Sequence, residues 1–201
     1  AEGTLGLVTA ATLKLFPKPH AYATAVAAIS GVPVAVDLLR RLQRATGGLV
    51  TAFELMHRRS LELVVKHIPG TANPLPDHDG WLLLIEVSSP NAFDATESMQ
   101  QTLAAAIESG AVLNAAFAKT ERDRQALWRL PETLPDAPRS DEATIANDIS
   151  VQPSCIAEFL ERTDSAIRTA LPSARSYPFG HVGDGNLHYA IKAPGDEAAL
   201  L

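Results

Sequence analysis

The chain has 201 residues, of which 46% are hydrophobic and 20% charged, with a formal net charge of −6. This composition is typical of a globular domain with a buried core, and no apolar run approaches the roughly 20 residues of a membrane-spanning helix. Lys and Arg form no basic stripe, which argues against nucleic acid as a partner. The one cysteine, Cys155, excludes an internal disulfide and favours a reducing compartment, for which we predict the cytoplasm. Cys155 lies in an apolar helical pattern, so we expect a packed thiol.

The first residues read as a glycine-containing turn followed by a strand. Thr and aliphatic residues predict this strand over residues 7–15, and Pro17 and Pro19 then mark a domain boundary. We therefore predict two domains, at residues 1–19 and 20–201. The chain starts without Met and stops inside the first turn of a new helix, so we expect it to be a piece of a longer protein.

Strands and helices alternate from residue 21 onward. Period-two and apolar runs predict strands at residues 21–29, 49–56, 81–87, 111–118 and 187–192, with another leading into residue 181. Helices are predicted from residue 33 to the glycines at 47–48, at 60–67, from the Ser89-Pro90 cap to residue 110, from the Thr120 cap through Trp128 to a stop at Pro131, and from 153 to 171. The order of elements predicts an α+β fold, a ferredoxin-like antiparallel sheet with helices on one face.

The most informative stretch runs from His181 to His188 and reads H-V-G-D-G-N-L-H. In the strand that follows, Asn186 and His188 share one face, while Leu187 and Tyr189 face a core. Two imidazoles beside a carboxamide could begin a metal site. Asp-Gly is also a strong hairpin-turn dipeptide, and by spacing alone a turn without any ligand is the favoured explanation.

The full octapeptide resembles the H-x-G-D-G-N-[LI]-H signature of the C-terminal domain of FAD-linked oxidases, a family with D-lactate dehydrogenases, D-2-hydroxyglutarate dehydrogenases and the glycolate oxidase subunit. Residues 2–9, E-G-T-L-G-L-V-T, resemble the segment that closes the FAD-binding domain in the same family, which makes residues 1–19 the last strand and edge of that domain. The resemblance implies the same ferredoxin-like architecture. It also implies that FAD lies against Glu2, Gly3, Thr4, Gly6 and Val8.

The resemblance further implies an enzyme that oxidises a small 2-hydroxy acid by hydride transfer to FAD, with a divalent metal (Zn, Mn or Fe) holding the substrate. His181 and His188 match the family's metal-binding histidines, and Asn186 matches an amide that contacts the substrate. The third ligand and the general base are implied in an E-H-G segment beyond residue 201, so we expect this piece alone to be inactive. A homodimer is left open. A metal-dependent hydrolase would need a nearby acid that the sequence does not identify.

The chain departs from the family pattern at three positions. Pro131 replaces the arginine of W-x-x-R-E, Ala146 replaces the lysine of K-x-D-[IV]-S-[VL]-P, and Gln152 replaces its proline. Loss of both cations would weaken the hold on an anionic substrate. Arg129 and Arg139 do not occupy the matching positions and are expected in solvent. The alternative function is therefore a catalytically degenerate paralogue or fragment that acts as a binding or assembly module.

Other polar residues have simpler explanations. Glu54 lies among apolar neighbours and either faces the flavin side or pairs with an arginine at the sheet edge. Asp148 and Ser150 are expected to stabilise a strand end. The remaining histidines are predicted to be solvated: His20, His57, His67 and His78.

Overall fold

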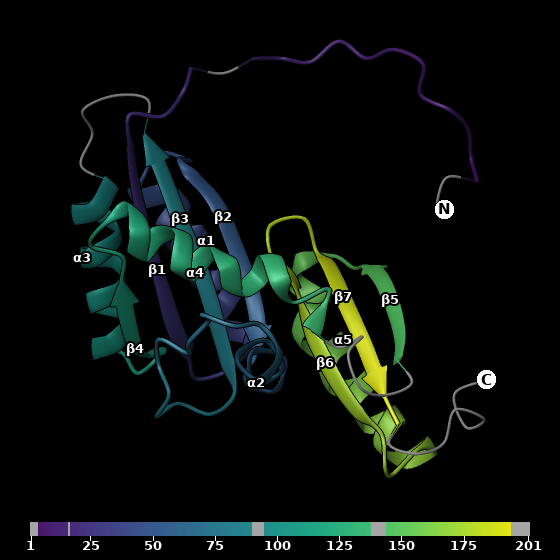
Figure 1. Ribbon diagram of the computed structural model, residues 1–201. Helices are drawn as coiled ribbons and strands as arrows, with labels where there is room; N and C mark the ends of the chain where they lie inside the picture. Colours follow the sequence, from purple (N-terminus) through teal and green to yellow (C-terminus); the bar gives the residue numbers. More distant parts are fainter. Residues whose placement is uncertain (1–3, 16, 90–94, 138–143, 194–201) are drawn as a thin grey trace.

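The computed structural model describes residues 4–15, 17–89, 95–137 and 144–193. Within them, seven strands form one antiparallel sheet in the order β4-β1-β3-β2-β6-β7-β5 (Figure 1). The strands are β1 (Ala21–Ile29), β2 (Val50–His57), β3 (Trp81–Ser89), β4 (Val112–Phe117), β5 (Thr144–Ser150), β6 (Arg175–His181) and β7 (Asn186–Lys192). The helices are α1 (Val32–Ala45), α2 (Arg58–His67), α3 (Ala95–Glu108), α4 (Glu121–Thr133) and α5 (Ile156–Ala170), with a short 3-10 turn, η2 (Pro153–Cys155).

The first four strands form the predicted ferredoxin-like unit. Their order β4-β1-β3-β2, with α1 and α3 as the two crossover helices, is that of a split βαβ pair. β1 is buried along seven of its nine residues because it lies between β3 and β4. β6, β7 and β5 extend this sheet beyond β2, so the α+β antiparallel fold is confirmed.

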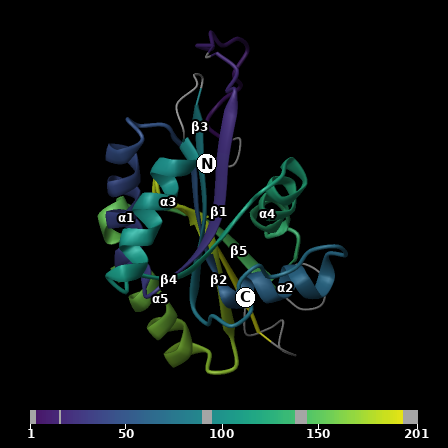
Figure 2. The ribbon, with the colours of Figure 1, turned by 90° about the vertical axis from the view of Figure 1, so that its left-hand side faces the viewer.

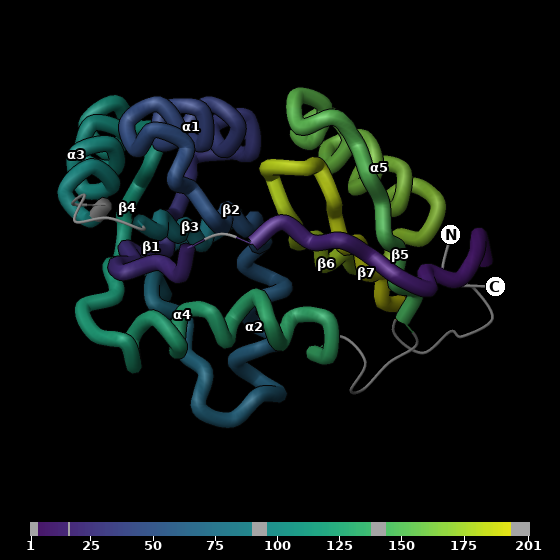
Figure 3. Tube along the Cα trace, turned by 90° about the horizontal axis from the view of Figure 1, so that it is seen from above, coloured from purple at the N-terminus to yellow at the C-terminus, as the bar shows by residue number. Residues whose placement is uncertain are grey.

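The prediction that the helices cover one face is wrong, because helices pack on both (Figures 2 and 3). α1, α3 and α5 cover one face, here called the α1 face, and α2 and α4 cover the other, the α4 face. The physical reason is that the central strands are apolar on both sides. In β3, Leu83 and Ile85 belong to the core of the α1 face, whereas Leu82 and Leu84 belong to the core of the α4 face.

Residues 7–15 do not form the predicted strand. This segment has no strand partner among the described residues and runs as an extended chain outside the sheet (Figure 1). Its large apolar side chains are exposed, with Leu7 at 94% and Leu15 at 89%. A strand needs a neighbour for its backbone N–H and C=O groups, and the described part of the chain supplies none here.

Several predicted element ends are corrected. Ser89 is the last residue of β3 rather than a helix cap, and Pro90 lies outside the described residues. α4 has the predicted capping box between Thr120 and Asp123 but continues through Pro131 to Thr133. Cys155 is exposed, because the buried stripe of α5 begins one residue later. No helix among the described residues has the length and apolarity needed to cross a membrane.

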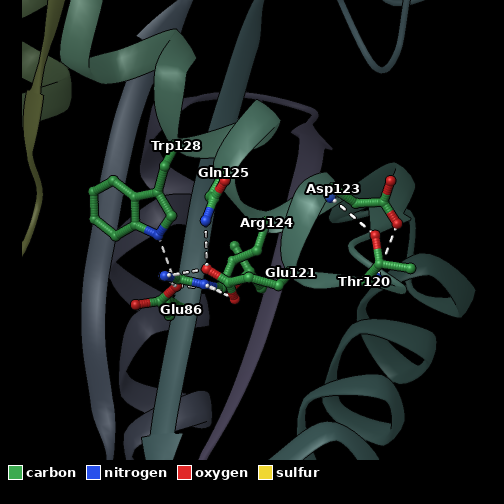
Figure 4. A network of polar contacts seen from close by, with 8 residues as sticks. Glu86, Thr120, Glu121, Asp123, Arg124, Gln125 and Trp128 are labelled. Carbon is green, nitrogen blue, oxygen red and sulfur yellow. Dashed lines mark hydrogen bonds and ion pairs between the residues drawn. The ribbon is translucent and has the colours of Figure 1, made fainter.

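α4 is fixed to the sheet by a buried carboxylate. Glu86, 5% exposed on β3, accepts hydrogen bonds from Trp128 Nε1 at 2.6 Å, Thr24 Oγ1 at 2.8 Å and Arg124 Nη1 at 3.1 Å. All three donors reach the same oxygen, Oε2, and Figure 4 shows two of them descending from α4 onto β3. A buried charge is tolerated only when it is paired in this way, so Glu86 sets where α4 lies on the α4 face.

Candidate functional site

The two histidines of the octapeptide lie on the hairpin of β6 and β7. His181, the last residue of β6, pairs with Asn186, the first residue of β7. The ring centroids of His181 and His188 are 5.8 Å apart, with the rings nearly perpendicular at 80°. The hairpin thus brings both imidazoles and Asn186 to one face, the α4 face, while Leu187 and Tyr189 are buried on the α1 face, as the alternation predicts.

The turn between the two strands explains one glycine of the motif and not the other. Asp184 Oδ1 accepts the Asn186 N–H at 3.0 Å, which closes the turn. Gly185 has a φ of +74°, and a Cβ there would lie 1.8 Å from the carbonyl oxygen of Val151. Gly183, in contrast, has no atom within 4 Å of such a Cβ. Gly185 is therefore required both by its backbone conformation and by the close approach of the chain at Val151.

His181 meets a buried acid from β2. β2 and β6 pair through three residue pairs, one of which places Glu54 opposite His181. His181 Nδ1 lies 2.5 Å from Glu54 Oε2, and the Glu54 side chain is only 12% exposed. Burial raises the pKa of the Glu54 carboxyl, while the adjacent His181 imidazole opposes this rise. Glu54 therefore pairs with a histidine rather than with an arginine.

His188 also contacts a carboxylate, from the strand β5 on the other side of β7. β5 and β7 place Asp148 opposite His188, and His188 Nδ1 contacts Asp148 Oδ1. The His188 ring also stacks on Phe179, with centroids 4.8 Å apart and planes inclined by 29°. Phe179 belongs to the apolar core beneath α2 and α4, so the imidazole is held between a carboxylate and a packed aromatic ring. Sequence reasoning assigned Asp148 to a strand end and missed this contact.

The two carboxylates decide which nitrogen of each imidazole is available. Because Nδ1 of His181 and of His188 faces a carboxylate, a neutral ring carries its proton there and keeps a lone pair on Nε2. Carboxylate–histidine pairs of this kind orient metal-binding imidazoles in many proteins, so the donor set fits a divalent metal. Among the described residues, however, no group of three or more His, Cys, Asp or Glu side chains converges into a metal cage. The described residues offer the two imidazoles as ligand positions and no third.

The positions expected to bind FAD and substrate are only partly described. Glu2 and Gly3 lie outside the described residues, and Thr4, Gly6 and Val8 are exposed in the extended segment. Their contact with FAD remains a prediction, as does the role of Asn186.

The positions where the family pattern has cations carry none. Ala146 lies on β5 opposite Ala190, two residues from Asp148, and Pro131 is in the last turn of α4. Arg129 is exposed and its Nη1 lies against Gly70, 3.3 Å from where a Cβ would be. Arg139 falls outside the described residues. The described part of the site therefore has no arginine or lysine at either of the two matching positions.

Similarity to known proteins agrees with this geometry. The model of the family "FAD linked oxidases, C-terminal domain" matches residues 18–200. The chain is 28% identical to a mitochondrial D-2-hydroxyglutarate dehydrogenase of Rattus norvegicus over 100% of its own length and 37% of the relative. It is 32% identical to a D-2-hydroxyglutarate dehydrogenase of Stutzerimonas stutzeri, over 96% of its own length and 41% of the relative. The chain thus spans less than half of the length of these curated relatives.

Solved structures support the same fold. An alkyldihydroxyacetonephosphate synthase superposes with a TM-score of 0.55 at 12% identity, over 89% of this chain and 37% of the synthase. p-Cresol methylhydroxylase superposes with a TM-score of 0.54 at 11% identity, over 90% of this chain and 40% of the hydroxylase. At such low identity the likeness concerns the fold alone. From the match to the family model, the chain belongs to the FAD-linked oxidases, as their C-terminal domain.

Proposed function

We propose that this chain is the substrate- and metal-binding part of an FAD-dependent enzyme that oxidises a 2-hydroxy acid, of the D-lactate, glycolate or 2-hydroxyglutarate type, to the 2-oxo acid. The observation that carries the proposal is the pair of carboxylate-bound imidazoles on one sheet face. The names of the relatives, D-2-hydroxyglutarate dehydrogenases, support the same reaction class. We expect the parent protein in the cytoplasm, although several relatives are named as mitochondrial.

His181 and His188 would hold a divalent metal through Nε2. FAD, when bound, accepts the hydride, and the metal, when bound, polarises the hydroxyl and carboxylate oxygens of the acid. The acidic partners Glu54 and Asp148 would hold each imidazole in one tautomer and make its Nε2 a better donor. Asn186, in register with His181, would donate a hydrogen bond to the same substrate. The third metal ligand would come from the parent protein outside this chain.

Among these three types of substrate, two residues of the chain favour the acids with less negative charge than 2-hydroxyglutarate. Pro131 and Ala146 stand where the family pattern has an arginine and a lysine, which would pair with carboxylates of the substrate. The same two residues favour the second candidate function, a catalytically degenerate module that keeps the fold and binds a ligand or partner. The paired histidines favour the enzyme, because a module without metal has no need of two oriented Nε2 atoms.

The test uses the full-length parent protein. We would record its flavin spectrum and metal content and add D- and L-2-hydroxy acids under anaerobic conditions. We expect one acid to bleach the flavin, and we expect His181→Ala and His188→Ala each to lower both the metal content and the rate of bleaching. His20→Ala is the matched control, since His20 is an exposed histidine outside the hairpin.

The alternative function predicts a different result. Bound flavin that no acid reduces, together with no bound metal, would reject the oxidase and leave the degenerate module. Bleaching that persists unchanged in both hairpin variants would keep the oxidase but reject the metal role of the histidines.

A further inference from the structure

A cavity of about 300 Å³ lies on the α1 face of the sheet, whereas the histidine hairpin projects onto the α4 face. This half-open cavity is lined by the first residues of α1, the end of β2, the starts of α2 and β3, the helix α5 and the strands β6 and β7. Its apolar wall is formed by Pro33, Trp81, Leu160 and Pro178. A volume of this size suits a small molecule, at the lower end of the range of ligand pockets.

The cavity contains one charge that no described residue neutralises. Arg59 is half-buried in its wall, and its guanidinium makes no ion pair or hydrogen bond with the described residues. The other cation of the wall, Arg168, pairs with Asp164, which also accepts a hydrogen bond from Ser176 at 2.6 Å. The remaining acid, Glu161, is exposed at the rim. Among the described residues, Arg59 is therefore the cation of this wall that has no ion-pair partner.

His57 adds a neutral donor beside this charge. Its Nδ1 accepts the backbone N–H of Arg59 at 3.1 Å, so the ring proton is on Nε2. Burial, reinforced by the nearby Arg59, lowers the pKa of His57 to about 4, and the ring is therefore uncharged at neutral pH. Nε2–H has no hydrogen-bond partner in the described part of the chain.

The start of α1, which also borders the cavity, is the positive end of its helix dipole. Val32 and Pro33 line the cavity, no side chain caps the helix, and its first turn has no acidic residue. Pro33 has no backbone N–H, and the Val34 N–H donates to Gly31 O at 3.1 Å, so the contribution of α1 is the positive end of its dipole, which favours a bound anion. Tyr189 also lines the cavity and is only 2% exposed.

We propose that this cavity is a second ligand site, which binds a small carboxylate anion with an apolar body. The carboxylate would accept hydrogen bonds from the Arg59 guanidinium and from His57 Nε2–H, close to the start of α1. The apolar body would pack on Trp81, Pro33 and Leu160. This site lies on the opposite side of the sheet from the histidine hairpin, so it does not depend on the proposed oxidation.

The test measures binding of phenylacetate to the full-length protein by titration calorimetry, with phenylacetamide as the uncharged isostere. We expect saturable one-to-one binding of phenylacetate, at least tenfold weaker binding of phenylacetamide, and a loss of at least tenfold in Arg59→Met. Arg59→Lys should recover part of the affinity because it restores the charge. Arg40→Met is the matched control, since Arg40 is an exposed arginine on α1 outside the cavity, and it should bind phenylacetate normally.

Two outcomes would overturn the proposal. One is the absence of saturable phenylacetate binding by the wild-type protein. The other is binding that Arg59→Met leaves unchanged and that His181→Ala removes, which would place the anion at the histidine hairpin. Thermal melting of each variant verifies that a lost affinity does not reflect a lost fold.

Discussion

Substitution of Glu86 by Gln is expected to loosen α4 from the sheet. The Glu86 carboxylate takes three charge-assisted hydrogen bonds on one oxygen, from Thr24, Arg124 and Trp128. Gln keeps the shape and one acceptor but loses the charge, which weakens each bond by about 1 kcal/mol. Arg124 retains its second partner, Glu121, so its share of the loss is smaller. The expected cost is therefore about 2 kcal/mol.

The assay is hydrogen exchange of the α4 amides in the full-length protein, followed by mass spectrometry. A cost of about 2 kcal/mol corresponds to roughly thirtyfold faster exchange, if α4 opens as a local unit. Glu121→Gln is the matched control, because it removes an exposed carboxylate from the same Arg124. It should leave the exchange of α4 almost unchanged. If exchange became equally faster in both variants, the hydrogen bonds of the buried Glu86 would contribute no more to the stability of α4 than those of the exposed Glu121.

Two further predictions concern the turn and the pH dependence. Gly185→Ala should destabilise the domain by about 1–3 kcal/mol, because alanine is strained at a φ of +74° and its Cβ would collide with the Val151 carbonyl. Gly183→Ala should have little effect, since no atom lies within 4 Å of a Cβ at that position. Thermal melting of both variants measures the difference. His57 has a folded-state pKa of about 4, below the ordinary 6.5, so the unfolded chain binds more protons between these values and stability should fall as the pH is lowered from 6.5 towards 4. The slope from this residue is at most about 1.4 kcal/mol per pH unit, and His57→Asn, which can still cap α2, should flatten it in melts recorded across that window. An unchanged slope in His57→Asn would show that another group titrates.

The sequence predicted correctly those features whose interacting residues are close together in the chain. Alternation in residues 187–192 gave the correct faces of β7, because a strand repeats every two residues whatever its neighbours are. The Thr120–Asp123 capping box was also predictable, since both of its hydrogen bonds lie within one turn. The same holds for the histidine hairpin, in which the turn residues and both imidazoles are close in sequence.

Features that depend on distant partners were not predictable. α4 passes Pro131 because Leu130 and Leu134 are buried in the core of the α4 face, which compensates for one missing backbone hydrogen bond. His57 was expected in solvent, yet it is half-buried and packs edge-on against Trp81 of β3, with ring centroids 4.8 Å apart. Nothing near these residues in the sequence indicates the contacts, because the partner strands or helices come from elsewhere in the chain.

The acid partners of the two histidines show the same division within the site itself. The spacing of His181 and His188 is set inside one hairpin, so it follows from the octapeptide. Asp148 reaches His188 through seven paired residues of β5 and β7, whereas Glu54 reaches His181 across the three residue pairs that join β2 to β6. That short seam connects the ferredoxin-like unit to the remaining strands, and the buried Glu54 has its histidine only while the seam is closed. The distance between the imidazoles is therefore set within the hairpin, whereas the carboxylate contact that orients the His181 ring depends on how the two parts of the sheet are joined.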